Sequence, residues 1–251
     1  MPMPDNEAFL SVGDLRVEYR GGVPGVAGVS LDLQAGGMAA VVGPNGAGKT
    51  SLLRAISGRP PGADWKVASG RITFGGDRID RLPAYRLVRK GVVMVPERDK
   101  VFPDLTVKEH LNMGRDSSSR GSRGSRGSRT ARIDRAVELF PVLERLLRQR
   151  AGHLSGGERQ MVAIAVAMGS KPRLLLIDEM SQGLSAAVLP PLVDAVRRVH
   201  DEGMTVLAVE QNARLALELT PDVYVMGLGC FVTSGPVYDA VQELRNGMRM
   251  R

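Results

Sequence analysis

Short apolar runs separated by glycine-containing turns open the chain and predict β-strands at residues 15–19, 29–33 and 38–42. Four later apolar runs, at residues 92–95, 174–177, 206–209 and 223–225, do not alternate with polar residues. A continuous apolar run is typical of a parallel strand that is buried on both faces. We therefore expect an antiparallel β edge that leads into a mostly parallel core sheet.

Helical patterns lie between these runs, at residues 49–57, 133–148, 156–168 and 186–200. Strands that alternate with helices of this length indicate an α/β fold, whose ligands bind at the carboxyl ends of the parallel strands. Residues 105–152 carry helical patterns without a strand pattern. This stretch is expected to form a helical lobe inserted into the sheet domain.

A Gly-Ser-Arg triplet is repeated within residues 116–132, and no apolar residue occurs between Asp116 and Thr130. Such a segment cannot bury enough surface to offset the entropy of ordering, so we expect a flexible basic linker rather than a specific binding site. Residues 115–135 hold seven Arg and two Asp, which accounts for most of the net charge of +7. The basic charge is therefore concentrated in one segment, and this weakens a nucleic-acid-binding interpretation.

Cysteine use and hydropathy place the chain in a reducing compartment. Cys230 is the single cysteine, and it has no metal-ligand spacing around it, so a small core residue is the favoured interpretation. No run approaches the length needed to cross a bilayer, and the first ten residues do not resemble a signal peptide. A cytoplasmic location is expected unless a partner holds the chain elsewhere.

The sequence GPNGAGKT follows the apolar run at residues 38–42 and precedes a helical pattern, the context that a phosphate-binding loop requires. Glycines let the backbone amides point at phosphate groups, assisted by the positive end of the following helix. We expect Lys49 to reach the β- and γ-phosphates of a nucleotide and the Thr50 hydroxyl to bind Mg²⁺. The loop residues that would contact the nucleotide are Gly43, Pro44, Asn45, Gly46, Ala47, Gly48, Lys49, Thr50 and Ser51.

Two carboxylates, Asp178 and Glu179, end the apolar run LLLIDE at the sheet edge where ligands bind. Asp178 is placed to hold Mg²⁺, and Glu179 to polarise the attacking water. On its own this pattern is equally typical of a cap for the next helix. The phosphate-binding loop upstream favours the catalytic interpretation.

LSGGERQ, at residues 154–160, has two compatible interpretations. Ser155 and Glu158 have the spacing of a capping box that opens the apolar helix after them. Ser155, Gly156 and Gly157 also present a hydroxyl and unobstructed amides at a helix start, which is typical of an anion site.

The phosphate-binding loop, LSGGE and LLLIDE, in this order, resemble the ABC-type ATPases, for which LSGGQ-like segments are the signature. The resemblance runs from about Leu15 to Val237. It implies a P-loop NTPase core, RecA-like, of residues 8–104 and 170–251, with a helical subdomain at 105–169 that contains the linker. It also implies a head-to-tail dimer with ATP and Mg²⁺ between the loop of one subunit and the signature of the other, so that Ser155 and Gly157 touch the γ-phosphate in the partner's site.

Further residues take roles from the same resemblance. Tyr19 matches the aromatic residue that stacks on adenine, although a half-buried strand aromatic is an alternative. Glu97, in VPERDKVFPDLTV, stands where the family usually has a Gln that contacts Mg²⁺ and couples nucleotide state to the membrane subunits. Gln211, in VEQNA, stands where a His usually senses the γ-phosphate; an amide can donate a hydrogen bond there but cannot be protonated. Both replacements resemble the branched-chain amino acid importers.

Three departures from the family pattern, Val166, Met180 and Ser185, leave Lys49, Thr50, Asp178 and Glu179 intact. They bear on turnover and coupling more than on activity itself.

The leading hypothesis is therefore an ATP-binding and ATP-hydrolysing subunit of an importer for branched-chain or other hydrophobic amino acids. Its expected partners are a second ATPase subunit, two transmembrane permease subunits and, indirectly, a solute-binding protein, with the chain peripheral on the inner face of the cell membrane. Urea or amide importers are close alternatives. A non-transport ABC ATPase acting on nucleic acid or the ribosome, and a regulatory subunit that barely hydrolyses ATP, are the others.

Overall fold

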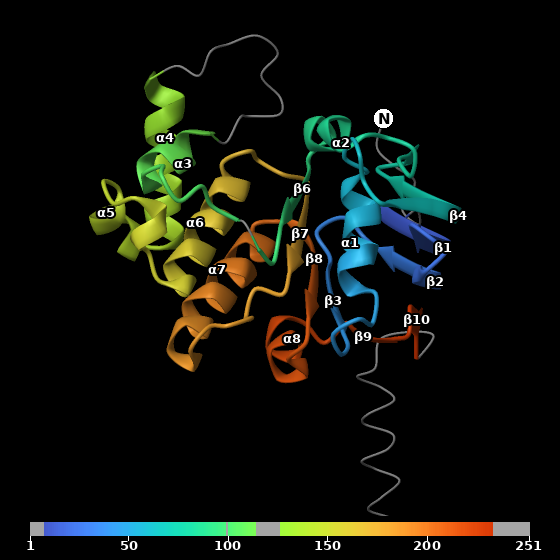
Figure 1. Cartoon of the computed structure of the whole chain (residues 1–251). Coiled ribbons are helices and arrows are strands. Elements are labelled where there is room, and N and C mark those ends of the chain that lie inside the picture. Colours follow the sequence, from blue (N-terminus) through green and yellow to red (C-terminus); the bar gives the residue numbers. More distant parts are fainter. Residues whose placement is uncertain (1–7, 99, 114–125, 233–251) are drawn as a thin grey trace, which may run out of the picture.

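The computed structural model describes residues 8–98, 100–113 and 126–232, with side chains from residue 129 onward in the last range. Two sheets and the helices between and beside them form a layered α/β fold (Figure 1). No helix in the described ranges is long and apolar enough to span a membrane.

The first sheet is antiparallel, with the order β2-β1-β4-β5. Along β1, alternate residues such as Leu10, Val12, Leu15 and Val17 are buried, as expected for a strand with one face in the core. The strands are β1 (Leu10–Tyr19), β2 (Pro24–Leu33), β4 (Trp65–Phe74) and β5 (Asp77–Arg78).

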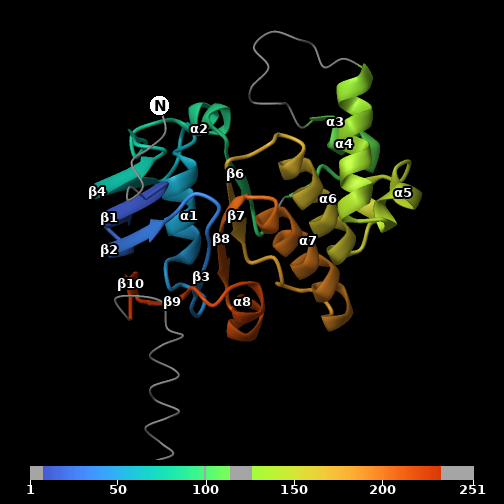
Figure 2. The ribbon, with the colours of Figure 1, turned by 180° about the vertical axis from the view of Figure 1, so that it is seen from behind.

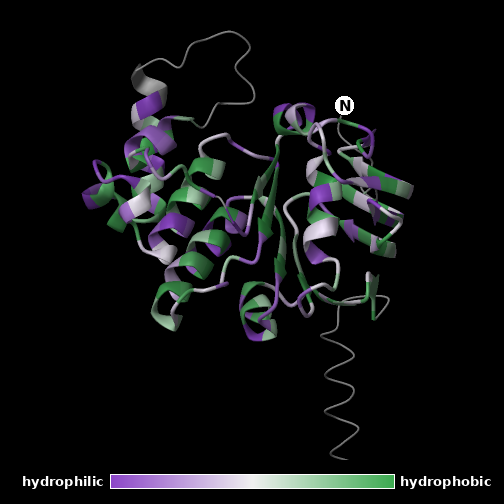
Figure 3. Cartoon of the chain, in the orientation of Figure 1, coloured by the Kyte–Doolittle hydropathy of each residue, from purple (hydrophilic) through white to green (hydrophobic). Residues whose placement is uncertain are grey.

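The second sheet has the order β10-β9-β3-β8-β7-β6 and is parallel except for the β9–β10 pair. Its strands are β3 (Met38–Val42), β6 (Val92–Val95), β7 (Leu174–Asp178), β8 (Thr205–Glu210), β9 (Val223–Gly227) and β10 (Cys230–Phe231). The central strands are coloured as hydrophobic along most of their length (Figure 3).

Two hydrophobic cores lie on opposite faces of this sheet, which explains the uninterrupted apolar runs. Leu175 and Ile177 of β7 pack into the core beneath α6 and α7, whereas Leu174 and Leu176 pack into the core around α1 and the antiparallel sheet. The two views in Figures 1 and 2 show α1 between the sheets, with α6 and α7 on the other side of the parallel sheet. The strands therefore carry ligand-binding residues only where they end.

The helices cover both faces of the parallel sheet. Their bounds are α1 (Lys49–Ser57), α2 (Ala84–Lys90), α3 (Val107–Met113), α4 (Arg126–Leu139), α5 (Val142–Leu146), α6 (Gly156–Met168), α7 (Leu189–Asp201) and α8 (Ala213–Leu219). Two short 3-10 helices, η1 (Ala151–His153) and η2 (Ala186–Val188), precede α6 and α7. Helices α3 to α6 pack on one another at one end of the molecule.

Several sequence predictions are confirmed. The bounds of β3, β6, α1 and α6 match the predicted ranges, and the described part of residues 105–152 forms helices without a strand. The sequence patterns missed β4, β5, α2, α3 and α8.

Two predictions about the helical region are wrong in part. Residues 126–132, predicted to belong to the flexible linker, form the first half of α4. The rest of that linker up to residue 125 lies outside the described residues, apart from none of its predicted length being a strand or helix pattern in the sequence. The helix predicted at residues 133–148 ends at Leu139 because Pro141 follows, and a separate helix, α5, begins at Val142.

Candidate functional site

The loop between β3 and α1 has a backbone that only glycine can adopt at several positions. Gly46 and Gly48 have φ of 79° and 105°, in the left-handed region that disfavours side chains. A Cβ on Gly43 would lie 2.2 Å from the Met226 carbonyl oxygen of β9. The glycines therefore allow the loop to curl at the carboxyl end of β3 and lead directly into the first turn of α1.

Lys49, the first residue of α1, is buried and held by the loop itself. Its Nζ donates to the carbonyl oxygens of Gly43 at 2.8 Å and Pro44 at 3.1 Å. The same Nζ forms an ion pair with Glu179 Oε1 at 3.0 Å. This places the loop lysine and the predicted catalytic carboxylate in direct contact.

Thr50 and Asp178 also meet across the site, although they are far apart in the sequence. Thr50 Oγ1 donates to Asp178 Oδ1 at 3.0 Å. Burial raises the pKa of Asp178 to about 6; the Thr50 hydrogen bond opposes this rise, and the nearby carboxylates of Glu179 and Glu97 add to it. A cation beside Asp178 would relieve this unfavourable burial of negative charge.

Glu179 is held in the left-handed backbone region, with φ of 44°. Its amide donates to the Val209 carbonyl oxygen of β8 at 2.9 Å. The turn that follows is fixed by Glu210, whose carboxylate accepts hydrogen bonds from Ser181 N at 3.2 Å and Ser181 Oγ at 2.6 Å. Burial raises the pKa of Glu210, against the lowering effect of the Ser181 bonds.

Sequence reasoning missed Glu210, and a signal for it exists. A charged residue that directly ends the apolar run of β8 is buried with the strand, and a buried carboxylate requires donors nearby.

Tyr19 stands at the end of β1, next to α1. Its hydroxyl is within hydrogen-bonding distance of Ser51 Oγ at 3.0 Å and accepts from Arg54 at 3.3 Å. A Cβ on Gly25 would lie 2.6 Å from the Tyr19 ring, so the ring packs closely over the start of β2. Gly25 and Arg54 were not identified from the sequence.

A hollow brings most of the predicted nucleotide-binding residues together. It is lined by Tyr19, Val23, Pro24, Gly25, Asn45, Gly46, Ala47, Gly48, Lys49, Thr50, Ser51, Glu97 and Glu179. Glu97 also forms an ion pair with Arg98 Nε at 2.9 Å. Gln211 is exposed just beyond β8 and does not line this hollow.

The LSGGE residues lie at the start of α6 and do not line the hollow. Ser155 caps α6: its Oγ accepts from Glu158 N at 3.2 Å, and Glu158 Oε2 accepts from Ser155 N at 2.8 Å. The predicted capping box is therefore confirmed. Gly157 packs so closely on η2 that a Cβ there would lie 2.2 Å from Val188 Cγ1.

The three departures from the family pattern lie in different surroundings. Met180 is fully buried and Val166 packs against the same core, beneath α6 and α7. Ser185 is exposed before η2. Two of the three therefore affect packing, and Ser185 is on the surface.

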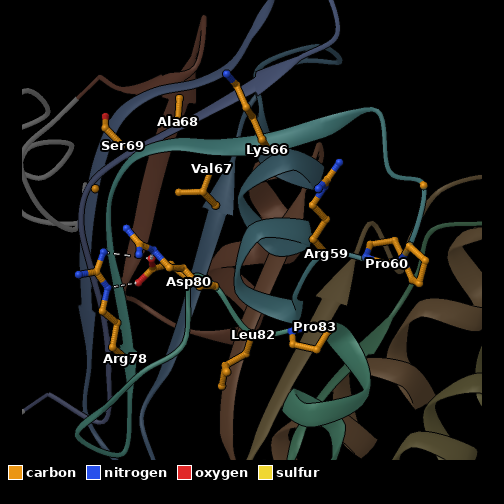
Figure 4. A pocket seen from close by; sticks show the side chains of 14 residues that line it. Arg59, Pro60, Lys66, Val67, Ala68, Ser69, Arg78, Asp80, Leu82 and Pro83 are labelled. Atoms are coloured by element: carbon orange, nitrogen blue, oxygen red, sulfur yellow. Dashed lines mark hydrogen bonds and ion pairs between the residues drawn. The ribbon is translucent and has the colours of Figure 1, made fainter.

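A second hollow lies between β4 and the loop after α1, and it contains none of the predicted site residues (Figure 4). Arg59, Lys66, Arg78 and Arg81 contribute positive charge to it. Two of these are already engaged, because Arg78 forms two hydrogen bonds with Asp80, and Arg59 donates to the Ala63 carbonyl oxygen. This hollow has no feature that ties it to phosphate chemistry.

The oxygens of Thr50 and Asp178 suit a hard divalent cation. No group of three or more His, Cys, Asp or Glu side chains that could hold a metal occurs within the described part of the chain. Such sparse protein ligation fits Mg²⁺, which usually keeps several waters and is bound through substrate phosphates with one or two protein groups.

A glycine loop at the end of a parallel strand, a buried lysine at the start of the next helix and paired acids on a neighbouring strand define a P-loop nucleotide-binding protein. The family model described as ABC transporter matches residues 26–182. The high-affinity branched-chain amino acid transport ATP-binding protein BraG of Pseudomonas aeruginosa is 39% identical over 214 residues, covering 85% of this chain and 87% of that protein.

A second relative is the probable branched-chain amino acid transport ATP-binding protein LivF of Archaeoglobus fulgidus, which is 34% identical and covers 86% of this chain and 87% of its own length. Among solved structures, a nucleotide-free ATP-binding cassette from an ABC transporter has a TM-score of 0.81 at 22% identity, with 96% of each chain covered. This chain belongs to the ABC transporter family. It binds nucleotide and is an ATPase whose hydrolysis is coupled to transport.

Proposed function

We propose that this chain energises an importer of branched-chain or other hydrophobic amino acids by hydrolysing MgATP at the hollow beside α1. The observation that carries the hydrolytic site is the meeting of Lys49 with Glu179 and of Thr50 with Asp178. The relatives named for branched-chain amino acid transport support the substrate class. Glu97 and Gln211, which resemble the residues of the same importers, support it as well.

In this proposal the amides of residues 43–48 and the Lys49 ammonium bind the β- and γ-phosphates. Tyr19 packs against the adenine, and Ser51 supports the phosphate end. Thr50, Asp178 and Glu97 hold Mg²⁺, which neutralises charge on the phosphates when it is bound. Gln211 donates a hydrogen bond towards the γ-phosphate.

Glu179 orients and polarises the attacking water as general base. Its carboxylate forms an ion pair with Lys49, so this pair has to open before Glu179 can accept a hydrogen bond from water. Phosphate oxygens would replace Glu179 as the partner of the lysine. The left-handed backbone of Glu179 and the Glu210–Ser181 hydrogen bonds fix the direction from which the carboxylate acts.

We further propose that a second ATPase subunit completes the site. Ser155, Gly156, Gly157 and Glu158 stand outside the hollow, at a capped helix start that can receive an anion. One solved cassette of the same fold is a dimer bound to ADP and Pi. Two permease subunits would hold the pair at the inner face of the cell membrane, and a solute-binding protein would deliver the amino acid.

The domain organisation proposed with this function is a core of residues 8–104 and 170–251 and a helical subdomain at 105–169. Helices α3 to α6, which pack on one another, fall within the second range. This division would let the signature at the start of α6 move relative to the phosphate-binding loop.

The test replaces Glu179 with Gln in the full chain. We expect phosphate release from ATP to fall at least about 100-fold, because a positioned general base contributes about that much or more, while ATP binding persists. In cells that carry Glu179→Gln in place of the native chain, uptake of labelled leucine should be lost.

Glu144→Gln is the matched control, because Glu144 is an exposed residue of α5 far from the hollow in sequence and outside its lining. It should hydrolyse ATP and support leucine uptake at the native level. Wild-type rates of phosphate release in Glu179→Gln would contradict the catalytic role. Normal leucine uptake in cells whose Glu179→Gln protein no longer hydrolyses ATP would contradict the proposed substrate.

A further inference from the structure

Lys100 links the segment that carries Glu97 to the helix that carries the signature. Its ammonium donates a hydrogen bond to Gln160 Oε1. Gln160 lies in the second turn of α6 and is fully buried. A side chain that follows β6 therefore reaches into the helix that begins next to Ser155.

The orientation of the Gln160 amide follows from the chemistry of its partner. A lysine ammonium can only donate, so the amide oxygen has to face it. The amide nitrogen then points elsewhere, and it has no hydrogen-bond partner within the described residues. Among these residues, the hold of Gln160 on its surroundings through hydrogen bonds of its side chain therefore depends on Lys100.

Opposing charges act on the Lys100 ammonium. Burial lowers the pKa of Lys100, and Arg159 on α6 lowers it as well. The carboxylates of Glu97, Asp178 and Glu210 favour the charged form. Two of these acids, Glu97 and Asp178, are those proposed above to hold the divalent cation.

We propose that Lys100 is a positioning residue that couples the charge at Glu97 and Asp178 to the position of α6 through Gln160. This inference rests on the proposed Mg²⁺ site. A divalent cation between the two acids cancels their attraction for Lys100, so the ammonium is held by Gln160 alone. By thermodynamic reciprocity, a change that holds Lys100 away from the acids strengthens cation binding, and a change that releases it towards them weakens cation binding.

The experiment measures the affinity of the full chain for ADP by calorimetry, once with EDTA and once with Mg²⁺. The ratio of the two dissociation constants is the metal gain. Lys100→Met removes a positive charge near the acids, and we expect the metal gain to rise about threefold to tenfold. Lys100→Arg keeps the charge and should stay within about twofold of the native gain.

Lys108→Met is the control for loss of a lysine charge, because Lys108 is an exposed residue of α3. Its metal gain should equal that of the native chain. A rise as large as that of Lys100→Met would show a general effect of net charge and would overturn the proposal.

A double-mutant cycle tests the link to α6. Gln160→Met removes the acceptor of Lys100, so the ammonium turns towards the acids and the metal gain should fall about threefold. In the Lys100→Met background the same substitution should leave the metal gain unchanged. A merely structural role of Gln160 would give equal effects in both backgrounds.

An unchanged metal gain in Lys100→Met, or equal effects of Gln160→Met in both backgrounds, would overturn the inference while the metal site stands. Absence of any metal gain in the native chain would overturn the proposed Mg²⁺ site, and this inference with it. If circular dichroism shows that Gln160→Met is unfolded, the comparison of Lys100→Met with Lys100→Arg decides: equal gains in the two variants would contradict the proposal.

Discussion

At the residue scale, the acids of the site carry charge in surroundings that disfavour it. Asp178 and Glu210 are each 1% exposed, and each receives hydrogen bonds from one neighbouring residue, Thr50 and Ser181 respectively. Burial of a carboxylate with few donors lowers the stability of the charged form. The fold therefore maintains negative charge where the proposed cation would bind.

This environment predicts how stability depends on pH. The pKa of Asp178 is about 6 in the folded chain, against 3.8 ordinarily. A raised pKa in the folded state contributes stability that is fully present below the ordinary pKa and is lost as the pH rises through 6. Asp178→Asn should therefore raise the free energy of unfolding near pH 8 by about 2–3 kcal/mol and change it little near pH 4.

Urea unfolding in EDTA at the two pH values measures this effect. Asp104→Asn, at an exposed loop position, is the control and should change stability equally little at both. A destabilising effect of Asp178→Asn near pH 8 would contradict the burial argument.

The sequence predicted the residues of continuous motifs better than the contacts between distant segments. The glycines of residues 43–48 and the acids of LLLIDE are readable because each motif is local. The Glu210–Ser181 and Lys100–Gln160 contacts join segments that lie 29 and 60 residues apart. Spacing along the chain does not reveal which side chains such segments bring together.

At the element scale, the close approach of α6 to η2 depends on one glycine. A Cβ on Gly157 would lie 2.2 Å from Val188 Cγ1, whereas a Cβ on Gly156 would lie 3.2 Å from the tip of Leu184. Gly157→Ala has to displace a β-branched side chain, and we expect it to lower the free energy of unfolding by about 1–3 kcal/mol.

Gly156→Ala, one position earlier in the same turn, should be tolerated better because the Leu184 tip can move. Urea unfolding of the two variants compares them directly. Equal stabilities would show that η2 adjusts freely, against the tight packing described here.

Burial on both faces explains which elements the sequence could predict. Strands β3 and β6 to β8 lie between two cores, so their apolar runs are continuous and their predicted bounds agree with the structure within one residue. Strand β4, WKVASGRITF, alternates between buried and exposed residues and contains a glycine, which hides its pattern. Pro141 could have shown the break between α4 and α5.

At the scale of the whole molecule, the parallel sheet brings the ends of β3 and β7 to one edge, although more than a hundred residues separate them. The resulting hollow contains the loop, Glu97 and Glu179 but not the signature at the start of α6. One chain therefore supplies two incomplete halves of a site. In a two-fold dimer each half would meet the complementary half of the partner.

Complementation between two inactive variants tests this shared site most directly. Lys49→Ala disables the phosphate-binding loop and Ser155→Arg blocks the signature, so each variant alone should hydrolyse almost no ATP. Mixed in equal amounts, they should recover about a quarter of the native rate of phosphate release, because half of the dimers are mixed and each of these has one intact site. A mixture that remains as inactive as its two components would contradict the account.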